Sequence, residues 1–308
     1  MKKIILILVL FIMSIGIASC DVIVVDSSKD VTIIMPTGTP SLALAKYASS
    51  SDVKAEIVSG SEGLVAAFTN KSHDFIVAPV NLGAKMYQTN GSYILYKTFV
   101  WGNLYVASKK QITSINDLNG KEVVVFGQNS TPDIVFKSIL KNNPELDIKV
   151  TYVSDVTSAN SLLASSKADY VLSAEPSLTK LKSKFDLYTI DLQEVYAEMT
   201  GTSSYPQAGI FVKKELINKE HIKTALEKMS SSIKDAINNP SECATFAVLL
   251  HESFKTIGEA DLTKAIPNCH YGLLESDKEA VLYYLQTMKD LGFGKQMGEN
   301  LPDENFFY

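Results

Sequence analysis

The 308-residue chain contains no arginine, and all 29 of its basic residues are lysines. Without a guanidinium group, no side chain can hold a carboxylate or phosphate through two parallel hydrogen bonds. An anionic part of a ligand would have to be held by lysine, by hydroxyl groups or by backbone N–H groups. This absence counts against a carboxylate clamp for amino acids or peptides.

Cysteine and histidine are also scarce. The chain has three cysteines, Cys20, Cys243 and Cys269. The last two could form a disulfide in an extracellular setting or remain separate buried thiols, and the sequence leaves both open. The histidines show no spacing typical of metal ligands, so we expect no metal site and no cofactor. They are His73, His221, His251 and His270.

Two further absences limit the function. The chain lacks the G-x-x-x-x-G-K-[ST] phosphate-binding loop, so any use of ATP must lie in a partner. After loss of the first 19 residues, 27 lysines oppose 34 acidic residues, which gives a formal charge of −7. A protein with this charge and no basic stripe repels polyanions, which argues against nucleic acid as a partner.

An apolar run, Ile4–Ala18, follows two lysines at the start of the chain. As a helix it would span about 23 Å, which is shorter than the roughly 30 Å hydrocarbon core of a membrane. The pattern is therefore typical of a secretion signal and not of a permanent membrane span.

Residues 17–20, Ile-Ala-Ser-Cys, resemble a bacterial lipobox. Under this interpretation residues 1–19 are a signal peptide, Cys20 carries lipid that anchors the protein to the cell membrane, and residues 20–29 form a spacer. The alternative is ordinary cleavage near Ser19, which would leave Cys20 as a free thiol. We expect an extracytoplasmic, lipid-anchored protein.

From residue 31 the pattern alternates between β-rich runs and helical segments, and it does so in two successive blocks. This order predicts parallel sheets with helices on their faces. The first block has strands at 31–35, 53–58 and 74–78, and helices at 40–47, 62–68 and 81–87. The second has strands at 122–126, 148–153 and 168–172, helices at 132–140 and 156–164, and another helix beginning at 175–176.

Two extended stretches, 93–108 and 204–212, could connect the blocks. We therefore predict an α/β fold of two lobes, each a mainly parallel sheet flanked by helices, with two crossing strands as the hinge and a helical C-terminal region. Lobe I would comprise 30–101 and 206–308, and lobe II 102–205. The C-terminal helices are expected at 219–238, 240–251, 258–265 and 276–290.

The two blocks match at VTIIM–PTGT–P and EVVVF–GQNST–P, where a strand leads through a hydroxyl-bearing turn to a helix. Ligands of open α/β sheets bind at the carboxyl ends of strands, near helix N-termini that favour electron-rich groups. The turns at Thr37–Thr39 and Gln128–Thr131 could therefore clamp a polar group. Alternatively, Thr-Pro is only a good helix start, with Thr39 as N-cap and Pro40 in the first turn. The matched pair favours the clamp.

Other residues could complete this cleft. Trp101 is the only tryptophan and could stack on a flat ligand or simply belong to the core. Tyr205 and Gln207 could supply an aromatic face and an amide. Asn81 and Glu175 follow predicted strand ends, and Glu175 could pair with a ligand amine or with a lysine near its own helix.

In combination and in order, several motifs resemble the substrate-binding lipoproteins of bacterial ABC importers, in the group that includes nitrate, sulfonate, taurine and thiamine-pyrimidine binders. The resemblance covers nearly all of the chain after Cys20. The motifs are TGTPSLALAK at 37–46, SGSEGLVAAF at 59–68, APVNLG at 78–83, VWGNLYV at 100–106, DLNGKEVVVFGQNSTPD at 117–133, AEPSLT at 174–179 and YPQAGIFVKKELI at 205–217.

The resemblance implies a fold like that of periplasmic binding proteins, closing about a hinge near 101–104 and 205–207. It implies a monomer that traps a small molecule and delivers it to an ABC permease with separate ATPase subunits. The ligand contacts expected from the residues and the resemblance together are Thr37, Gly38, Thr39, Ser59, Gly60, Asn81, Trp101, Asn103, Ser130, Thr131, Glu175, Tyr205 and Gln207.

The sequence leaves alternatives open for the type of ligand and for the class of protein. The hydroxyl, amide and aromatic groups favour a small heteroaromatic compound, and a sulfonate or another oxyanion is the alternative. The same fold looks similar to pyrimidine-synthesis and menaquinone-pathway enzymes, but no nucleophile–base arrangement is visible and the export signal argues against that role. A lipid-anchored receptor or adhesin is the third possibility.

Overall fold

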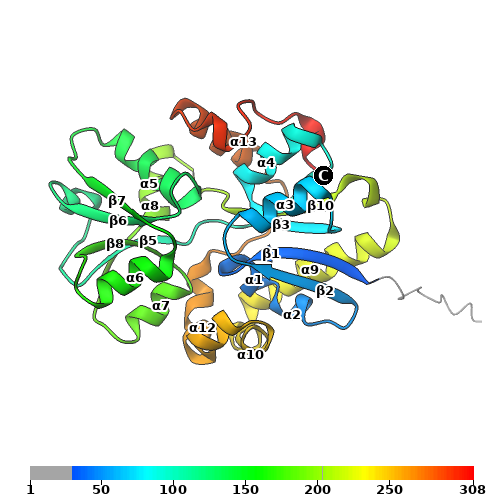
Figure 1. Ribbon diagram of the computed structural model, residues 1–308, viewed down its shortest axis with the longest axis horizontal. Helices are drawn as coiled ribbons and strands as arrows, with labels where there is room; N and C mark the ends of the chain where they lie inside the picture. The colour runs from blue at the N-terminus through cyan, green and yellow to red at the C-terminus, as the bar shows by residue number, and fades with distance from the viewer. Residues whose placement is uncertain (1–29, 203) are drawn as a thin grey trace, which may run out of the picture.

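The computed structural model describes residues 30–202 and 204–308, so the predicted signal peptide, Cys20 and the spacer lie outside the described residues. Two five-stranded sheets lie side by side with helices around each (Figure 1). We call the part built on the first sheet lobe I and the part built on the second lobe II. Assigning 30–101 and 206–308 to one domain and 102–205 to the other stays a prediction.

Lobe I contains the sheet with strand order β2-β1-β3-β10-β4. Strand β10 is the reversed strand: it pairs antiparallel with β3 and β4, whereas β1 pairs parallel with β2 and β3. The strands are β1 (Val31–Pro36), β2 (Val53–Val58), β3 (Phe75–Pro79), β4 (Tyr93–Val100) and β10 (Ala208–Lys213). The helices among them are α1 (Thr39–Ala43), α2 (Ala45–Ala48), α3 (Glu62–Asn70) and α4 (Val80–Asn90).

Lobe II repeats this arrangement with the order β7-β6-β8-β5-β9, and here β5 is the reversed strand. The prediction of two similar, mainly parallel sheets is therefore confirmed. The strands are β5 (Leu104–Ser108), β6 (Glu122–Phe126), β7 (Lys149–Val153), β8 (Tyr170–Ala174) and β9 (Tyr188–Asp191). The helices are α5 (Thr131–Asn142), α6 (Val156–Ala164), α7 (Ser177–Lys182) and α8 (Leu192–Thr200).

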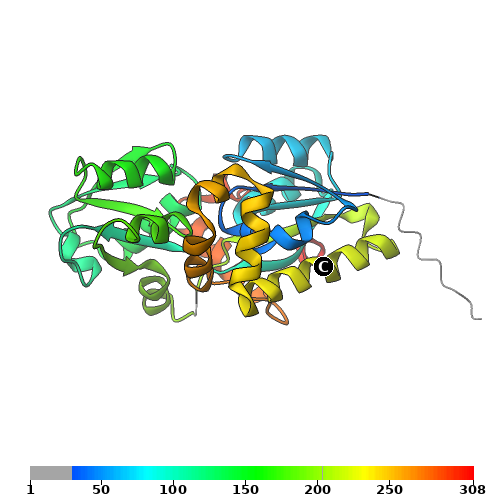
Figure 2. The same cartoon turned by 90° about the horizontal axis from the view of Figure 1, so that it is seen from below.

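The C-terminal region is helical, as predicted, and part of it bridges the lobes. Helices α11 and α12 lie between the two sheets on the underside of the molecule (Figure 2). Lys180 of α7 forms an ion pair with Asp261 of α12, with 3.1 Å between Nζ and Oδ2. The helices are α9 (Glu220–Asn238), α10 (Pro240–Leu250), α11 (Glu252–Ile257), α12 (Glu259–Ala265) and α13 (Lys278–Asp290).

The connections between the lobes meet at one place. The backbone N–H of Gln207 donates to the carbonyl of Val100 at 2.9 Å, and that of Trp101 donates to the carbonyl of His270 at 3.0 Å. Gly102 has a φ of +91°, which favours glycine, and a Cβ there would lie 2.6 Å from Cγ of Gln193. The crossing at 101–103 is therefore tightly constrained.

The prediction of one helix over 40–47 with Thr39 as its N-cap is wrong. The segment forms two short helices, and Gly38 is the N-cap of the first, with a φ of +102° and no side-chain capping bond. Thr39 lies inside α1, and its hydroxyl donates across the lobes to the carbonyl of Glu175, at 2.8 Å. The hydroxyl thus serves a tertiary contact and not the helix end.

Candidate functional site

A cavity of about 240 Å³ lies between the lobes, beside the crossings. Lobe I contributes Thr37–Thr39 and helix α11, and lobe II contributes the carboxyl ends of β6 and β8. Six of the predicted contacts line it: Thr37, Gly38, Thr39, Asn103, Glu175 and Gln207. This volume is below the usual range of pockets for drug-sized ligands, so the cavity suits a small molecule.

The floor of the cavity is a hydrogen-bond network centred on Asn103, which is 4% exposed. Its Nδ2 donates to the carbonyl of Glu175 at 3.1 Å and also to Oγ1 of Thr39. The backbone N–H of Glu175 in turn donates to the carbonyl of Asn103, at 3.1 Å. The crossing, the first turn of lobe I and the end of β8 are therefore held together.

Glu175 is the one ionisable side chain among the residues that line the cavity. Its carboxylate accepts hydrogen bonds from the backbone N–H of Thr179 at 3.0 Å and from the Thr179 hydroxyl at 2.9 Å. Burial raises the pKa of Glu175, while the Thr179 hydrogen bonds and the charge of Lys182 oppose the rise. Desolvation dominates, so ionisation of Glu175 destabilises the folded protein.

This raised pKa predicts how stability depends on pH. The protonated Glu175 side chain contributes to the free energy of unfolding. This contribution is fully present below the ordinary glutamate pKa of about 4.3 and is lost as pH rises through the pKa of the folded state. We expect Glu175→Gln to gain stability over the wild type as pH rises from 4 to 8, with little difference at pH 4, in thermal unfolding scans. The nearby Cys269 and Tyr105 do not titrate in this range, because burial raises the pKa of both. A difference that stays constant with pH would contradict this.

Two other predicted contacts, Asn81 and Thr131, meet between the lobes. The hydroxyl of Thr131 donates to Oδ1 of Asn81 at 3.3 Å, and Nδ2 of Asn81 donates to the carbonyl of Gln296 at 3.2 Å. Ser130 bonds within its own turn, donating to the carbonyl of Gly127 at 2.6 Å. The second turn thus contacts lobe I, as the clamp requires, although a ligand contact by these residues stays a prediction.

The remaining predicted contacts lie elsewhere. Trp101 is buried and its indole N–H donates to the carbonyl of Gly272 at 3.1 Å. Tyr205 is fully buried and donates to Oε1 of Gln193 at 2.8 Å. Ser59 and Gly60 are exposed and are not among the residues that line the cavity. A ligand contact by any of these four would require a different arrangement of the lobes.

The sequence did not indicate the contribution of α11. Ser253, Phe254 and Ile257 line the cavity from a helix about 150 residues along the chain from Asn103. Phe126 and Val156 of lobe II supply further apolar surface. No local pattern distinguishes these residues from ordinary core positions, because only the tertiary fold brings them to the cleft.

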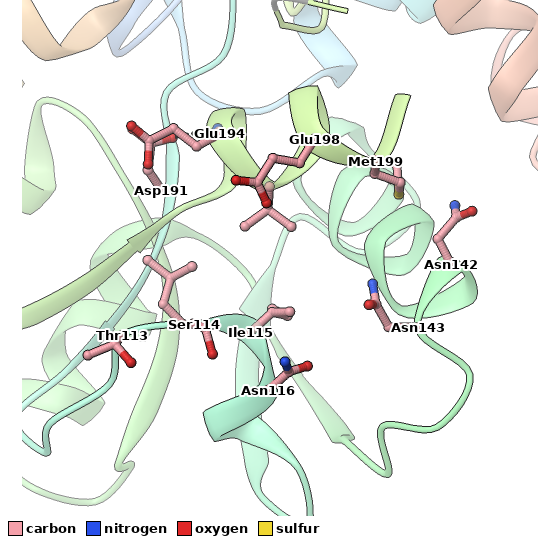
Figure 3. Close-up of a pocket in the computed structure, with 12 residues that line it drawn as sticks. Thr113, Ser114, Ile115, Asn116, Asn142, Asn143, Asp191, Glu194, Glu198 and Met199 are labelled. Atoms are coloured by element: carbon pink, nitrogen blue, oxygen red, sulfur yellow. Dashed lines mark hydrogen bonds between the residues drawn. The ribbon is translucent and has the colours of Figure 1, made fainter. Parts of the chain in front are cut away.

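A second, larger pocket of about 580 Å³ lies wholly within lobe II (Figure 3). Asp191, Glu194 and Glu198 face it on one side, with Asn142 and Asn143 at another. Polar and acidic groups predominate, and lobe I contributes nothing to it. We prefer the cavity between the lobes, because the first predicted turn and residues of both crossings, Asn103 and Gln207, line it together.

The two cysteines within the described residues are free thiols and both are buried. Each donates to a backbone carbonyl, Cys243 to Leu42 and Cys269 to Ala265. Across residues 30–202 and 204–308, no group of three or more His, Cys, Asp and Glu side chains is placed to hold a metal ion. Within the same residues, every helix is too short or too polar to cross a membrane.

Solved structures share the fold. An ABC transporter protein from Parabacteroides distasonis is 20% identical, with a TM-score of 0.75 over 90% of this chain and 98% of its own. The aliphatic sulphonate binding protein SsuA from Escherichia coli is 13% identical, with a TM-score of 0.67 over 89% of each chain. The zinc-bound ligand binding component of an ABC-type import system from Staphylococcus aureus is 13% identical, with a TM-score of 0.65 over 91% and 96%.

No curated protein sequence matches the chain. The family model described as NMT1/THI5 like matches residues 42–243, which include most of both sheets. The match therefore spans the turn before α5, both crossings and the end of β8. The chain belongs to the NMT1/THI5-like family.

Proposed function

We propose that the protein is the substrate-binding component of an ABC importer, which traps a small molecule between its lobes and delivers it to a permease. One observation carries the proposal: the cavity is built jointly by the ends of strands in both lobes and by the crossings between them. A ligand there would contact both lobes and favour their closure, because it binds the closed arrangement better than the open one.

The chemistry of the cavity supports binding and not catalysis. Its lining holds one ionisable group, Glu175, whose carboxylate accepts hydrogen bonds from the backbone and the hydroxyl of Thr179. Nucleophilic catalysis needs an activating base within hydrogen-bond reach of the nucleophile, and the carboxylate of Glu175 is hydrogen-bonded to Thr179 instead. Several structures of similar fold bear the titles of ABC transporter and sulfonate-binding proteins, which agrees with this role.

The location and the ligand are the finer parts of the proposal. The signal pattern and Cys20 support an extracytoplasmic, lipid-anchored monomer that docks on a permease with separate ATPase subunits. The small cavity and its two phenylalanines, Phe126 and Phe254, favour a small heteroaromatic ligand. An oxyanion such as a sulfonate is the alternative.

Thermal unfolding of the full chain in detergent tests the role, against pyrimidines, flavins, sulfonates, nitrate, amino acids and metals. A ligand at about 100 times its dissociation constant adds roughly 2.7 kcal/mol, which should raise the midpoint by about 5 °C. We expect one chemical class to do so, and small-angle scattering to show compaction with that ligand.

Two variants locate the effect. Ile257→Trp fills the cavity from α11 and should abolish the shift, whereas Glu194→Gln, in the separate lobe II pocket, should preserve it. A shift that survives Ile257→Trp would place the ligand elsewhere. No shift with any class in the panel would count against an importer role.

A further inference from the structure

The charges around the cavity between the lobes disfavour an anionic ligand. Of the residues that line it, Glu175 alone is ionisable, and none is a lysine or a histidine. An oxyanion entering this space would lose its hydration beside a carboxyl group and gain no cation in exchange. The side-chain donors in the lining that make no other hydrogen bond within the described residues are uncharged: the hydroxyl groups of Thr37, Thr157 and Ser177 and the amide nitrogen of Gln207.

Asn103 presents an acceptor whose orientation the network fixes. The Thr39 hydroxyl gives its proton to the carbonyl of Glu175, so Oγ1 of Thr39 must accept from Asn103. The amide nitrogen of Asn103 is therefore the end that points to Thr39 and Glu175, and Oδ1 is the end left over. No donor in the described part of the chain reaches Oδ1, although the atom is buried.

Gln207 supplies a second acceptor from the return crossing. Its Oε1 is also buried and also lacks a donor within the described residues. The backbone of Gln207 is fixed on both sides, since its N–H donates to Val100 and its carbonyl accepts from Val80. A buried carbonyl oxygen without a donor is destabilising, and a hydrogen bond from a ligand N–H group would offset this.

We propose that the cavity selects a small, uncharged or cationic ligand that donates N–H hydrogen bonds to Asn103 Oδ1 and Gln207 Oε1, and that it rejects oxyanions. This inference rests on the proposed function, because it takes the cavity as the binding site. Planar amide or amidine groups match it best, since they direct several N–H donors in one plane, and Phe126 and Phe254 add apolar surface to the lining.

Titration calorimetry on the full chain in detergent tests this with benzamidine, benzamide, benzoate and benzenesulfonate. The first three share a planar outline and differ in donors and charge. We expect benzamidine and benzamide to bind at least about tenfold more tightly than benzoate or benzenesulfonate, which corresponds to about 1.4 kcal/mol.

Two variants at one position separate the acceptor from the shape of the side chain. Gln207→Met removes the oxygen and should weaken benzamidine binding about tenfold, whereas Gln207→Glu keeps an acceptor and should retain it. Equal binding by both variants would overturn the role of Gln207. Circular dichroism confirms that both fold.

The failures of the two proposals are distinct. If benzoate or benzenesulfonate binds more tightly, and Ile257→Trp blocks it, the selectivity is overturned while the capture role stands. If none of the four compounds binds, the selectivity is overturned and the wider ligand panel decides the role. If benzamidine binds equally to Ile257→Trp, the cavity is not the site and both proposals fail.

Discussion

Gly83→Ala is expected to destabilise the protein by about 3 kcal/mol, because it forces a methyl group into a filled core. A Cβ at Gly83, within α4, would lie 1.9 Å from Cζ of Phe211. That ring cannot move aside, since it is fully buried and packs against Phe68, with centroids 5.6 Å apart, and against Phe306, with centroids 6.1 Å apart. Urea unfolding followed by circular dichroism measures the loss.

Two variants control for the cause. Gly63→Ala changes another glycine in a helix, but the nearest atom to its new Cβ is Cγ1 of Val58, at 3.1 Å. We therefore expect the free energy of unfolding to change by less than about 1 kcal/mol. Combining Gly83→Ala with Phe211→Leu removes the ring and should recover part of the loss. A double variant less stable than the sum of both single changes would show that the clash is not the cause.

Asp133→Ala is expected to cost about 3 kcal/mol and to weaken ligand binding as well. The carboxylate is fully buried and accepts from the Asn129 backbone at 2.8 Å, from the Tyr152 hydroxyl at 2.8 Å and from Lys137 Nζ at 2.9 Å. Asn129 lies in the turn before α5 with a φ of +61°. Losing the carboxylate would free this turn, which leads directly to Thr131.

Asp117→Ala is the matched control. Its carboxylate also accepts three hydrogen bonds, from the backbone and hydroxyl of Thr113 and the backbone of Ser114, but it lies on the surface. Water replaces a lost partner there, so we expect a clearly smaller loss of stability and unchanged ligand binding. Equal losses in the two variants would show that burial does not set the strength of the Asp133 network. Chemical denaturation midpoints provide the comparison.

Most of the fold could be predicted because hydrophobic alternation and turn residues are local signals. The matched strand–turn–helix units around Thr39 and Thr131 became β1 and β6, each the second strand of its sheet. Short elements escaped prediction. β9 has four residues and α11 has six, which are too few to show a hydrophobic periodicity. Gly258 is the C-cap of α11 and ends the helix after Ile257.

The site was less predictable, because hydrogen bonds between distant residues decide what each side chain does. Asn103 and Glu175 are 72 positions apart, yet their mutual bonds form the floor of the cavity. The indole of Trp101 is directed to Gly272, 171 residues later, and no local pattern could show this. Polar residues at turns could be recognised as candidates, whereas their partners could not.

The meeting of Val100, Gln207 and His270 at the crossings has a mechanical consequence. Because hydrogen bonds join these segments at one place, we expect the lobes to rotate about that line and not to slide apart. A cavity beside the axis moves little during such a rotation, whereas the outer surfaces sweep through a much longer arc. A closing movement of a fraction of an ångström around a small ligand would thus produce a larger displacement of the outer surfaces, which a large partner can detect.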